Sequence, residues 1–151
     1  MATINPYLNF SGNTEEAFNF YKSVFGGEFI AFQRFKDTPE ADKVAAEDRE
    51  KIMHVSLPIG KGNVLMGSDT LESMGQKLTV GNNFYLSVNP ESEDETTKLF
   101  NALSAGGKVT MPLDKTFWGA YFGMVTDKFG TQWMVNYDYQ QDKEPATSKA
   151  L

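Results

Sequence analysis

The sequence of 151 residues contains no cysteine and only one histidine. Disulfide bonds, thiolate metal ligands and cysteine nucleophiles are therefore excluded, and so is a metal site built from several histidines. No apolar run approaches the roughly 18 residues that a membrane span needs, and the first residues lack the basic and apolar segments of a signal peptide. We therefore expect a cytoplasmic protein that does not span a membrane.

Nucleotide-binding and hydrolase motifs are also missing. There is no G-x-G-x-x-G, no G-x-x-x-x-G-K-[ST] and no G-x-S-x-G. The formal net charge of -6 repels phosphate backbones, so we expect no nucleic-acid partner. Aromatic residues are abundant, with 12 phenylalanines. They indicate a well-filled core, a pocket lined by rings, or both.

The most informative feature is an internal repeat. Tyr7 precedes an apolar-periodic stretch that ends at Gly26, and Tyr85 precedes a second stretch that ends at Gly106. The shift is 78 residues at the tyrosines and 80 at the glycines. A glycine in the left-handed conformation commonly ends a helix. The repeat therefore predicts one helix in each of two related modules.

Each predicted helix begins with the pattern of a capping box. Asn13 and Ser92 are expected to cap the free N–H groups of the first turn, and Glu16 and Glu95 to bond back. The apolar stripes that we expect to pack on the sheet are Ala17, Phe20, Tyr21, Val24 and Phe25 in the first helix, and Thr96, Leu99, Phe100 and Leu103 in the second.

Strand patterns surround both helices and predict an α+β fold of two paired βαβββ modules, with a curved mixed sheet enclosing a pocket and the helices outside. We expect a single domain 1–151, with module 1 at about 3–69, a linker at 70–81, module 2 at about 82–138 and a polar tail at 139–151. The predicted strands are 4–10, 28–35, 51–59 and 63–68, then 83–88, 108–112, 119–126 and 131–137. The polar stretch 36–51 is expected to be an exposed loop or short helix, with a lid as the alternative.

Side chains of a strand alternate between its two faces, which separates a packing face from an open face. Leu8, Phe10, Phe84 and Leu86 are expected to pack on the helices. The open face mixes polar and aromatic groups, as ligand sites do. Half-buried strand tyrosines and a packing tryptophan remain the alternatives at Tyr7, Tyr85 and Trp118. The expected ligand-binding residues are Asn5, Tyr7, Asn9, Ser56, Asn83, Tyr85, Trp118, Phe122, Met124, Gln132 and Met134.

His54 and Asp69 are the candidate catalytic residues. A histidine ordinarily titrates near pH 6.5, so His54 is the natural proton shuttle near neutral pH. Asp69 would orient His54 or bind the substrate. The alternatives are a histidine that only hydrogen-bonds and an aspartate that ends a strand in a turn.

The run from Pro6 to Tyr21 resembles the opening of PhnB-like proteins, which belong to the vicinal oxygen chelate (glyoxalase/bleomycin-resistance/dioxygenase) superfamily. The segments Met53-His54, 66–69 and 127–133 are similar to later signatures of that group. The resemblance implies paired βαβββ modules and a homodimer. Such sequences are often labelled demethylubiquinone methyltransferase-like, but no glycine-rich loop for a methyl donor is present, so we do not expect that activity.

The metal-using members of the superfamily place ligands on the first and last strands of each module. The resemblance puts those positions at Asn5, Met66, Asn83 and Met134. None is His or Glu, and methionine is too soft for the usual divalent ions, so we expect no metal and no cofactor.

The leading hypothesis is thus a metal-independent PhnB-like protein with a small-molecule pocket, either a binder or an enzyme. One alternative is a glyoxalase-type lyase or isomerase that recruits a divalent metal through unusual ligands. The other is a resistance protein that sequesters an aromatic, cationic drug, drawn by the negative charge.

Overall fold

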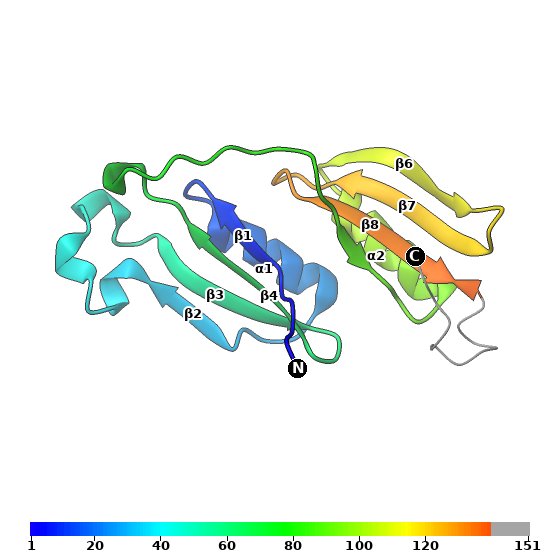
Figure 1. The fold of residues 1–151 in the computed structure, drawn as a ribbon, viewed down its shortest axis with the longest axis horizontal. Helices are drawn as coiled ribbons and strands as arrows, with labels where there is room; N and C mark the ends of the chain where they lie inside the picture. Colours follow the sequence, from blue (N-terminus) through cyan, green and yellow to red (C-terminus); the bar gives the residue numbers. More distant parts are fainter. Residues whose placement is uncertain (140–151) are drawn as a thin grey trace. The chain divides into compact units, whose positions relative to one another are not determined.

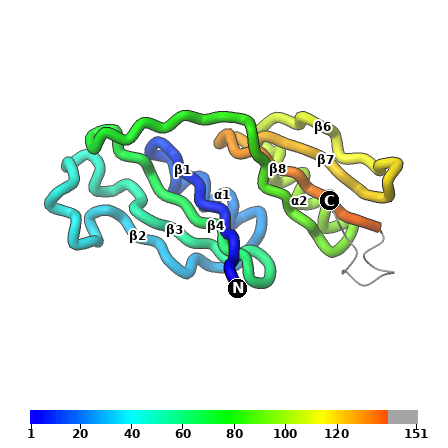
Figure 2. The backbone as a smooth tube through the Cα atoms, in the orientation of Figure 1, coloured from blue at the N-terminus to red at the C-terminus, as the bar shows by residue number. Residues whose placement is uncertain are grey.

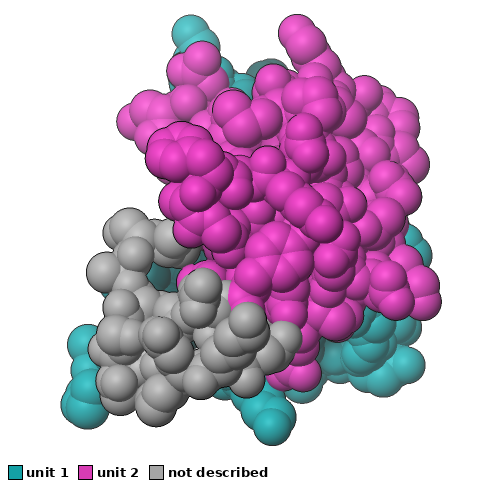
Figure 3. Space-filling model, turned by 90° about the vertical axis from the view of Figure 1, so that its right-hand side faces the viewer, with its two compact units in different colours: residues 1–80 teal, residues 81–151 magenta. Residues whose placement is uncertain are grey.

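The computed structural model describes residues 1–139, and the chain divides into two compact units, Met1–Val80 and Gly81–Leu151 (Figure 3). The boundary lies inside the stretch 70–81 that the sequence marks as a linker. Of the expected tail 139–151, all but Tyr139 lies outside the described residues. No helix within residues 1–139 is long and apolar enough to cross a membrane.

The first unit is one four-stranded sheet with a helix on one face (Figure 1). The strand order is β1-β4-β3-β2, with β1 parallel to β4 and the other pairs antiparallel. The helix packs against β3 and β4. The elements are β1 (Tyr7–Phe10), α1 (Thr14–Phe25), β2 (Ala31–Arg34), β3 (Ile52–Ile59) and β4 (Asn63–Asp69).

The second unit repeats this topology, with the strand order β5-β8-β7-β6. Figure 2 shows the backbone of β6, β7 and β8 side by side. Its elements are β5 (Leu86–Val88), α2 (Glu93–Ser104), β6 (Lys108–Lys115), β7 (Ala120–Thr126) and β8 (Gln132–Asp138). Again the first strand runs parallel to the last and the other pairs are antiparallel. The predicted α+β fold of two βαβββ modules is confirmed. The strands form two separate four-stranded sheets, one in each unit.

The strand register corrects the alignment of the two modules. Ser56 pairs with Met66, and Met124 pairs with Met134, so the hairpins match at a shift of 68. Tyr7 pairs with Met66, whereas Ser87 pairs with Met134. The counterpart of Tyr7 is therefore Ser87, not Tyr85. A slip of two residues keeps each side chain on the same face of the sheet.

The two helices begin differently. Ser92 caps α2 as predicted, because its Oγ accepts a hydrogen bond from the Glu95 N–H at 3.1 Å. The Glu95 carboxylate bonds to the N–H of Glu91, at 2.7 Å. The prediction for Asn13 is wrong, since its side chain makes no capping bond. The N–H of Thr14 donates instead to Asp69, which lies at the end of β4.

The polar stretch between β2 and β3 folds into three single-turn 3₁₀ helices, η1 (Phe35–Asp37), η2 (Ala41–Lys43) and η3 (Ala46–Asp48). The stretch was expected to be a loop or a short helix, and the structure shows a loop that contains short helical turns. Val44 and Asp48 are buried within it. A fourth turn, η4 (Glu72–Met74), follows β4, and Ser73 of this turn donates to the Asp48 carboxylate. The stretch is thereby tied to the body of the unit.

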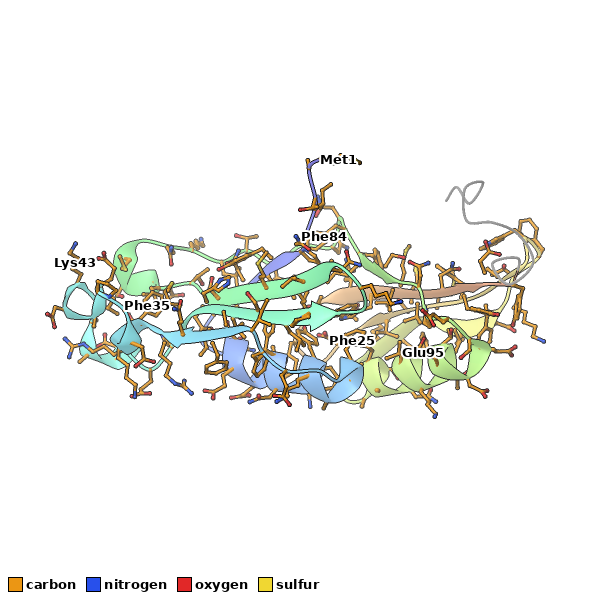
Figure 4. All side chains as sticks on the ribbon, turned by 90° about the horizontal axis from the view of Figure 1, so that it is seen from below. Met1, Phe25, Phe35, Lys43, Phe84 and Glu95 are labelled. Carbon is orange, nitrogen blue, oxygen red and sulfur yellow. The ribbon has the colours of Figure 1, made fainter. Side chains whose placement is uncertain are left out.

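Burial confirms the predicted packing face of β1. It contradicts the prediction for the residues just before β5. Leu8 and Phe10 are buried, and so is Phe18 of α1, which the predicted stripe left out. Phe84 was expected to pack, yet it precedes β5 and is 58% exposed. Figure 4 shows Phe84 on the side of its unit away from α2. The strand begins three residues later than expected, so the alternation does not govern Phe84.

Candidate functional site

A hydrogen-bonded chain of three side chains lies on the open face of the first sheet. The Tyr7 hydroxyl is 3.3 Å from Nδ1 of His54, and Nε2 of His54 is 2.8 Å from Oγ of Ser56. The Tyr7 and His54 rings lie 5.7 Å apart at 32°. The structure therefore brings together three residues that the sequence proposed for the site.

The strand register fixes this arrangement. Tyr7 of β1, Met66 of β4 and Ser56 of β3 are cross-strand partners, so their side chains share one face. His54 lies two residues before Ser56 on β3 and points to the same face. The neighbours Leu8, Val55 and Leu57 are buried. Along β1 and from His54 to Leu57 of β3, alternation thus sends apolar groups to the core and polar groups to the opposite face.

The three members differ in exposure, which limits what each can do. Tyr7 is 45% exposed and His54 is half-buried, so both are open to a ligand. Ser56 is buried, so it is placed to orient the imidazole rather than to attack a substrate. A neutral imidazole donates through one nitrogen and accepts through the other. Both tautomers satisfy this chain, so a proton can be passed along it without loss of either hydrogen bond.

Asp69, the second candidate catalytic residue, serves the fold instead. Its Oδ1 accepts hydrogen bonds from the N–H groups of Gly12 and Thr14 and from the Thr14 hydroxyl, at 2.9, 3.1 and 2.7 Å. Its Oδ2 accepts from the N–H of Ile52 at 2.8 Å. Asp69 is buried opposite Phe10, on the face that packs on α1. The structure does not bring it into the chain of Tyr7, His54 and Ser56.

Two predicted ligand-binding residues are engaged with the backbone. The Asn5 side-chain oxygen accepts from the N–H of Val64 at 3.0 Å, and Nε2 of Gln132 donates to the carbonyl of Phe84 at 2.6 Å. Both bonds hold the chain that leads into the first strand of each unit. Asn9, by contrast, is exposed on the open face, where it pairs with Ser68.

The remaining predicted residues belong to the second unit. Met124 pairs with Met134, and Phe122 pairs with Asn136, on the face away from α2. Trp118 is 56% exposed, and its ring lies 6.3 Å from that of Phe122. Asn83 is exposed and Tyr85 half-buried, and both precede β5. Within residues 81–139, this unit presents thioethers and rings, and no hydrogen-bonded chain through a histidine like that of His54.

The sequence reasoning missed Met111 and a polar cavity. Met111 pairs with Met124 and extends the row of methionines onto β6, but its face was not assigned from the short predicted strand 108–112. The cavity of about 340 Å³ is lined by Ser11, Glu47, Asp48, Lys51, Thr70, Glu72 and Ser73. The hydrogen bond from Lys51 lowers the pKa of Asp48. The only sequence signal for this cavity was the polar stretch 36–51.

The residues present do not fit a divalent metal ion. The first and last strands meet at Tyr7 and Met66 in one unit and at Ser87 and Met134 in the other. Asn5 and Asn83 lie outside the strands. Hard and borderline divalent ions prefer carboxylate and imidazole ligands over thioethers. Throughout residues 1–139, no group of three or more His, Asp or Glu side chains is placed to hold a metal ion.

The paired βαβββ units define the class of this protein. Solved structures described as glyoxalase/bleomycin resistance proteins share the fold, at 18% and 14% sequence identity with TM-scores of 0.54 and 0.59. The chain thus has the paired βαβββ fold of these proteins, as the sequence resemblance predicted.

Within that class, the profile of the family described as 3-demethylubiquinone-9 3-methyltransferase matches residues 2–136, and the chain belongs to this PhnB-like family. Protein YjdN of Escherichia coli is 33% identical, over 91% of this chain and 97% of its own. PA1353 of Pseudomonas aeruginosa is 42% identical over 91% and 98% of the two chains, with a TM-score of 0.81. A Bacillus cereus PhnB protein, described as a putative 3-demethylubiquinone-9 3-methyltransferase, is 27% identical over 90% and 99%, with a TM-score of 0.73.

Proposed function

We propose that the chain binds a small molecule on the open face of the first sheet and that His54 exchanges a proton with it, without a divalent metal ion. The observation that carries the proposal is the chain of hydrogen bonds from Tyr7 through His54 to Ser56. The sequence has no other imidazole. Acid–base chemistry near neutral pH therefore depends on this residue.

The geometry supports a division of roles. Ser56 is buried and holds Nε2, so the imidazole has a fixed orientation on the sheet. Tyr7 is exposed at the other nitrogen, and its hydroxyl can move from His54 to a ligand oxygen. A carbonyl or hydroxyl of the ligand would replace the Tyr7 hydroxyl as the hydrogen-bond partner of His54 Nδ1. His54 then donates or accepts the proton, and its hydrogen bond to Ser56 through Nε2 stays intact.

The methyl transfer named in the family description is not part of the proposal. A methyl donor such as a nucleoside sulfonium needs a site for its nucleoside, and the sequence carries no glycine-rich loop of that kind. The open face offers a hydroxyl, an imidazole and the exposed amide of Asn9 instead. These groups suit a neutral or anionic oxygen-bearing ligand.

The test uses diethyl pyrocarbonate, which acylates accessible imidazoles, and His54 is the one imidazole in the sequence. A panel of small carbonyl and phenol compounds is screened for those that raise the melting temperature and slow acylation of His54. A true ligand should lose at least about 10-fold in affinity with His54→Gln, the cost of one lost hydrogen bond to a charged or reacting group. Lys61→Gln, in the exposed turn between β3 and β4, is the control and should bind normally. Compounds that bind equally well to His54→Gln would refute the site.

We also propose that the protein is a cytoplasmic homodimer. Large apolar side chains of the second unit are exposed, among them Phe117 at 97% and Trp118 at 56%, and a partner surface would cover them. Light scattering should give twice the chain mass of 16.9 kDa. A mass of one chain across the micromolar range would contradict the dimer.

A further inference from the structure

Three methionines form a row across the second sheet. Met111 of β6 pairs with Met124 of β7, which pairs with Met134 of β8. Directly opposed residues of regularly paired strands point to the same face, with Cβ atoms about 5 Å apart, and this holds for Met124 and Met134. Met111 is also opposite Met124, but the register of β6 shifts on both sides of it, between Val109 and Met111 and between Met111 and Asp114. Three of the seven methionines in the chain therefore occupy paired positions on three adjacent strands.

The row lies on the face away from α2 and is open to ligands. Val125, Trp133 and Val135 alternate with the methionines on β7 and β8 and are buried, and α2 packs against these strands. Met111 is 44% exposed, while Met124 and Met134 are half-buried. The thioethers thus stand on a face that solvent reaches, and they do not belong to the closed core beneath α2.

The chemistry of this row selects a particular kind of ion. A thioether is a neutral, polarisable donor, and it suits soft monovalent ions such as Cu(I) but not Mg²⁺, Ca²⁺ or Zn²⁺. Methionine has three rotatable bonds, so sulfur atoms from neighbouring strands can converge although the backbone is fixed. Met124 has a thioether neighbour on each side. The net charge of -6 favours a cation over an anion near the protein.

We propose that the second unit binds one soft monovalent metal ion, Cu(I) or its analogue Ag(I), through the sulfur atoms of Met111, Met124 and Met134. This site is separate in its residues from the site around His54 and does not depend on the function proposed there. It also gives a chemical reason for methionine, rather than leucine, at three opposed positions.

The test is a titration of the full chain with silver nitrate in chloride-free buffer, followed by the NMR signals of methionine methyl groups labelled with ¹³C. The measurement uses His54→Gln as background, so that the imidazole does not compete for the ion. We expect saturation at one equivalent, with the methyl signals of Met111, Met124 and Met134 shifting together. The signals of Met1, Met53, Met66 and Met74 should stay unchanged and serve as internal controls.

Leucine variants separate sulfur ligation from apolar packing, because leucine keeps nearly the same volume and the fold should persist. Met124→Leu should weaken silver binding by at least about 10-fold, and the triple variant Met111→Leu, Met124→Leu, Met134→Leu by about 100-fold or more. Unchanged circular dichroism confirms that each variant is folded. Equal binding of silver to the parent and the folded triple variant, or shifts confined to the other methionines, would overturn the proposal.

Discussion

At the residue scale, two buried carboxylates at the ends of strands, Asp69 and Asp127, have structural roles, because each accepts several hydrogen bonds from nearby groups. Asp69 accepts four hydrogen bonds from three residues in two distant segments of the chain. Asp127 accepts from the N–H groups of Phe129 and Thr131 and from the indole of Trp133. Both are buried. The sequence marks both as turn formers, but it does not show that the Asp69 carboxylate reaches back to the start of α1.

Replacing Asp69 should therefore destabilise the first unit. Asp69→Ala leaves buried N–H groups without acceptors, and we expect a loss of about 3 kcal/mol or more in the free energy of unfolding. Asp69→Asn keeps one oxygen acceptor but turns an amide donor towards other donors, so a loss of about 2 kcal/mol is expected. Urea denaturation measures both. The exposed Asn9→Ala is the control, and a loss below that of the control would contradict the structural role.

The ion pair of Glu15 and Arg34 should give a pH dependence of known sign. Two hydrogen bonds of 2.9 and 2.8 Å from Arg34 lower the pKa of Glu15, against the opposing effect of burial. A carboxyl group with a lower pKa in the folded state stabilises the fold above its unfolded pKa of about 4.3 and loses that contribution as the pH falls through the folded value.

Glu15→Gln removes this contribution. Because the Glu15 side chain is 44% exposed, we expect a loss of less than about 1 kcal/mol at pH 7. The difference in free energy of unfolding between wild type and variant should shrink from pH 6 to pH 3. A difference that is the same at all pH values would show that the pair does not stabilise the protein through charge.

At the element scale, the helices sit close to their sheets because glycines occupy the contact points. A Cβ at Gly67 of β4 would lie 2.6 Å from a ring carbon of Phe18, and one at Gly123 of β7 would lie 2.5 Å from a ring carbon of Phe100. Neither glycine has a positive φ, so the requirement comes from space and not from backbone conformation. These close approaches fix α1 and α2 on their sheets.

Gly67→Ala should cost about 2 kcal/mol of unfolding free energy, within the range for overpacking a core. Adding Phe18→Leu should recover part of the loss from the ring contact, but not the strain against the Leu8 carbonyl, which is 2.9 Å away. Gly81→Ala is the matched control, because its nearest atom is 3.8 Å away and its φ is not positive. Equal stability of the Gly67 and Gly81 variants would contradict the packing.

Much at this scale could be predicted from the sequence. The period-two and period-3.6 patterns, the turn glycines and Ser92 gave both helices and all eight strands. The patterns did not predict the residue at which the first strand of each unit begins, because that strand starts only where it pairs with the last strand of the unit. Pairing is a contact between distant residues, so Tyr85 was aligned with Tyr7 where Ser87 is the true counterpart.

At the scale of the whole molecule, each unit carries its own sheet and the helix that packs on it. Both tryptophans, Trp118 and Trp133, lie in the second unit, so tryptophan fluorescence reports on that unit. Asp69 lies in the first. The two local cores can therefore be followed by different probes in one protein.

In Asp69→Ala, we expect urea to unfold the first unit before the second. The circular dichroism transition should begin at a lower urea concentration than the fluorescence transition, whereas the two should lie closer together in wild type. This outcome follows because the lost hydrogen bonds join elements of one unit only. Coincident transitions in the variant would show that the units unfold as one.

The most direct test of the functional account is the NMR spectrum of the single histidine, recorded with ¹⁵N in the imidazole while ligands from the screen are added. The account predicts that a ligand shifts both ring nitrogens of His54, and that Tyr7→Phe reduces its affinity while Ser56→Ala alters the free spectrum. A ligand that saturates the protein and stabilises it without moving either nitrogen would contradict the account.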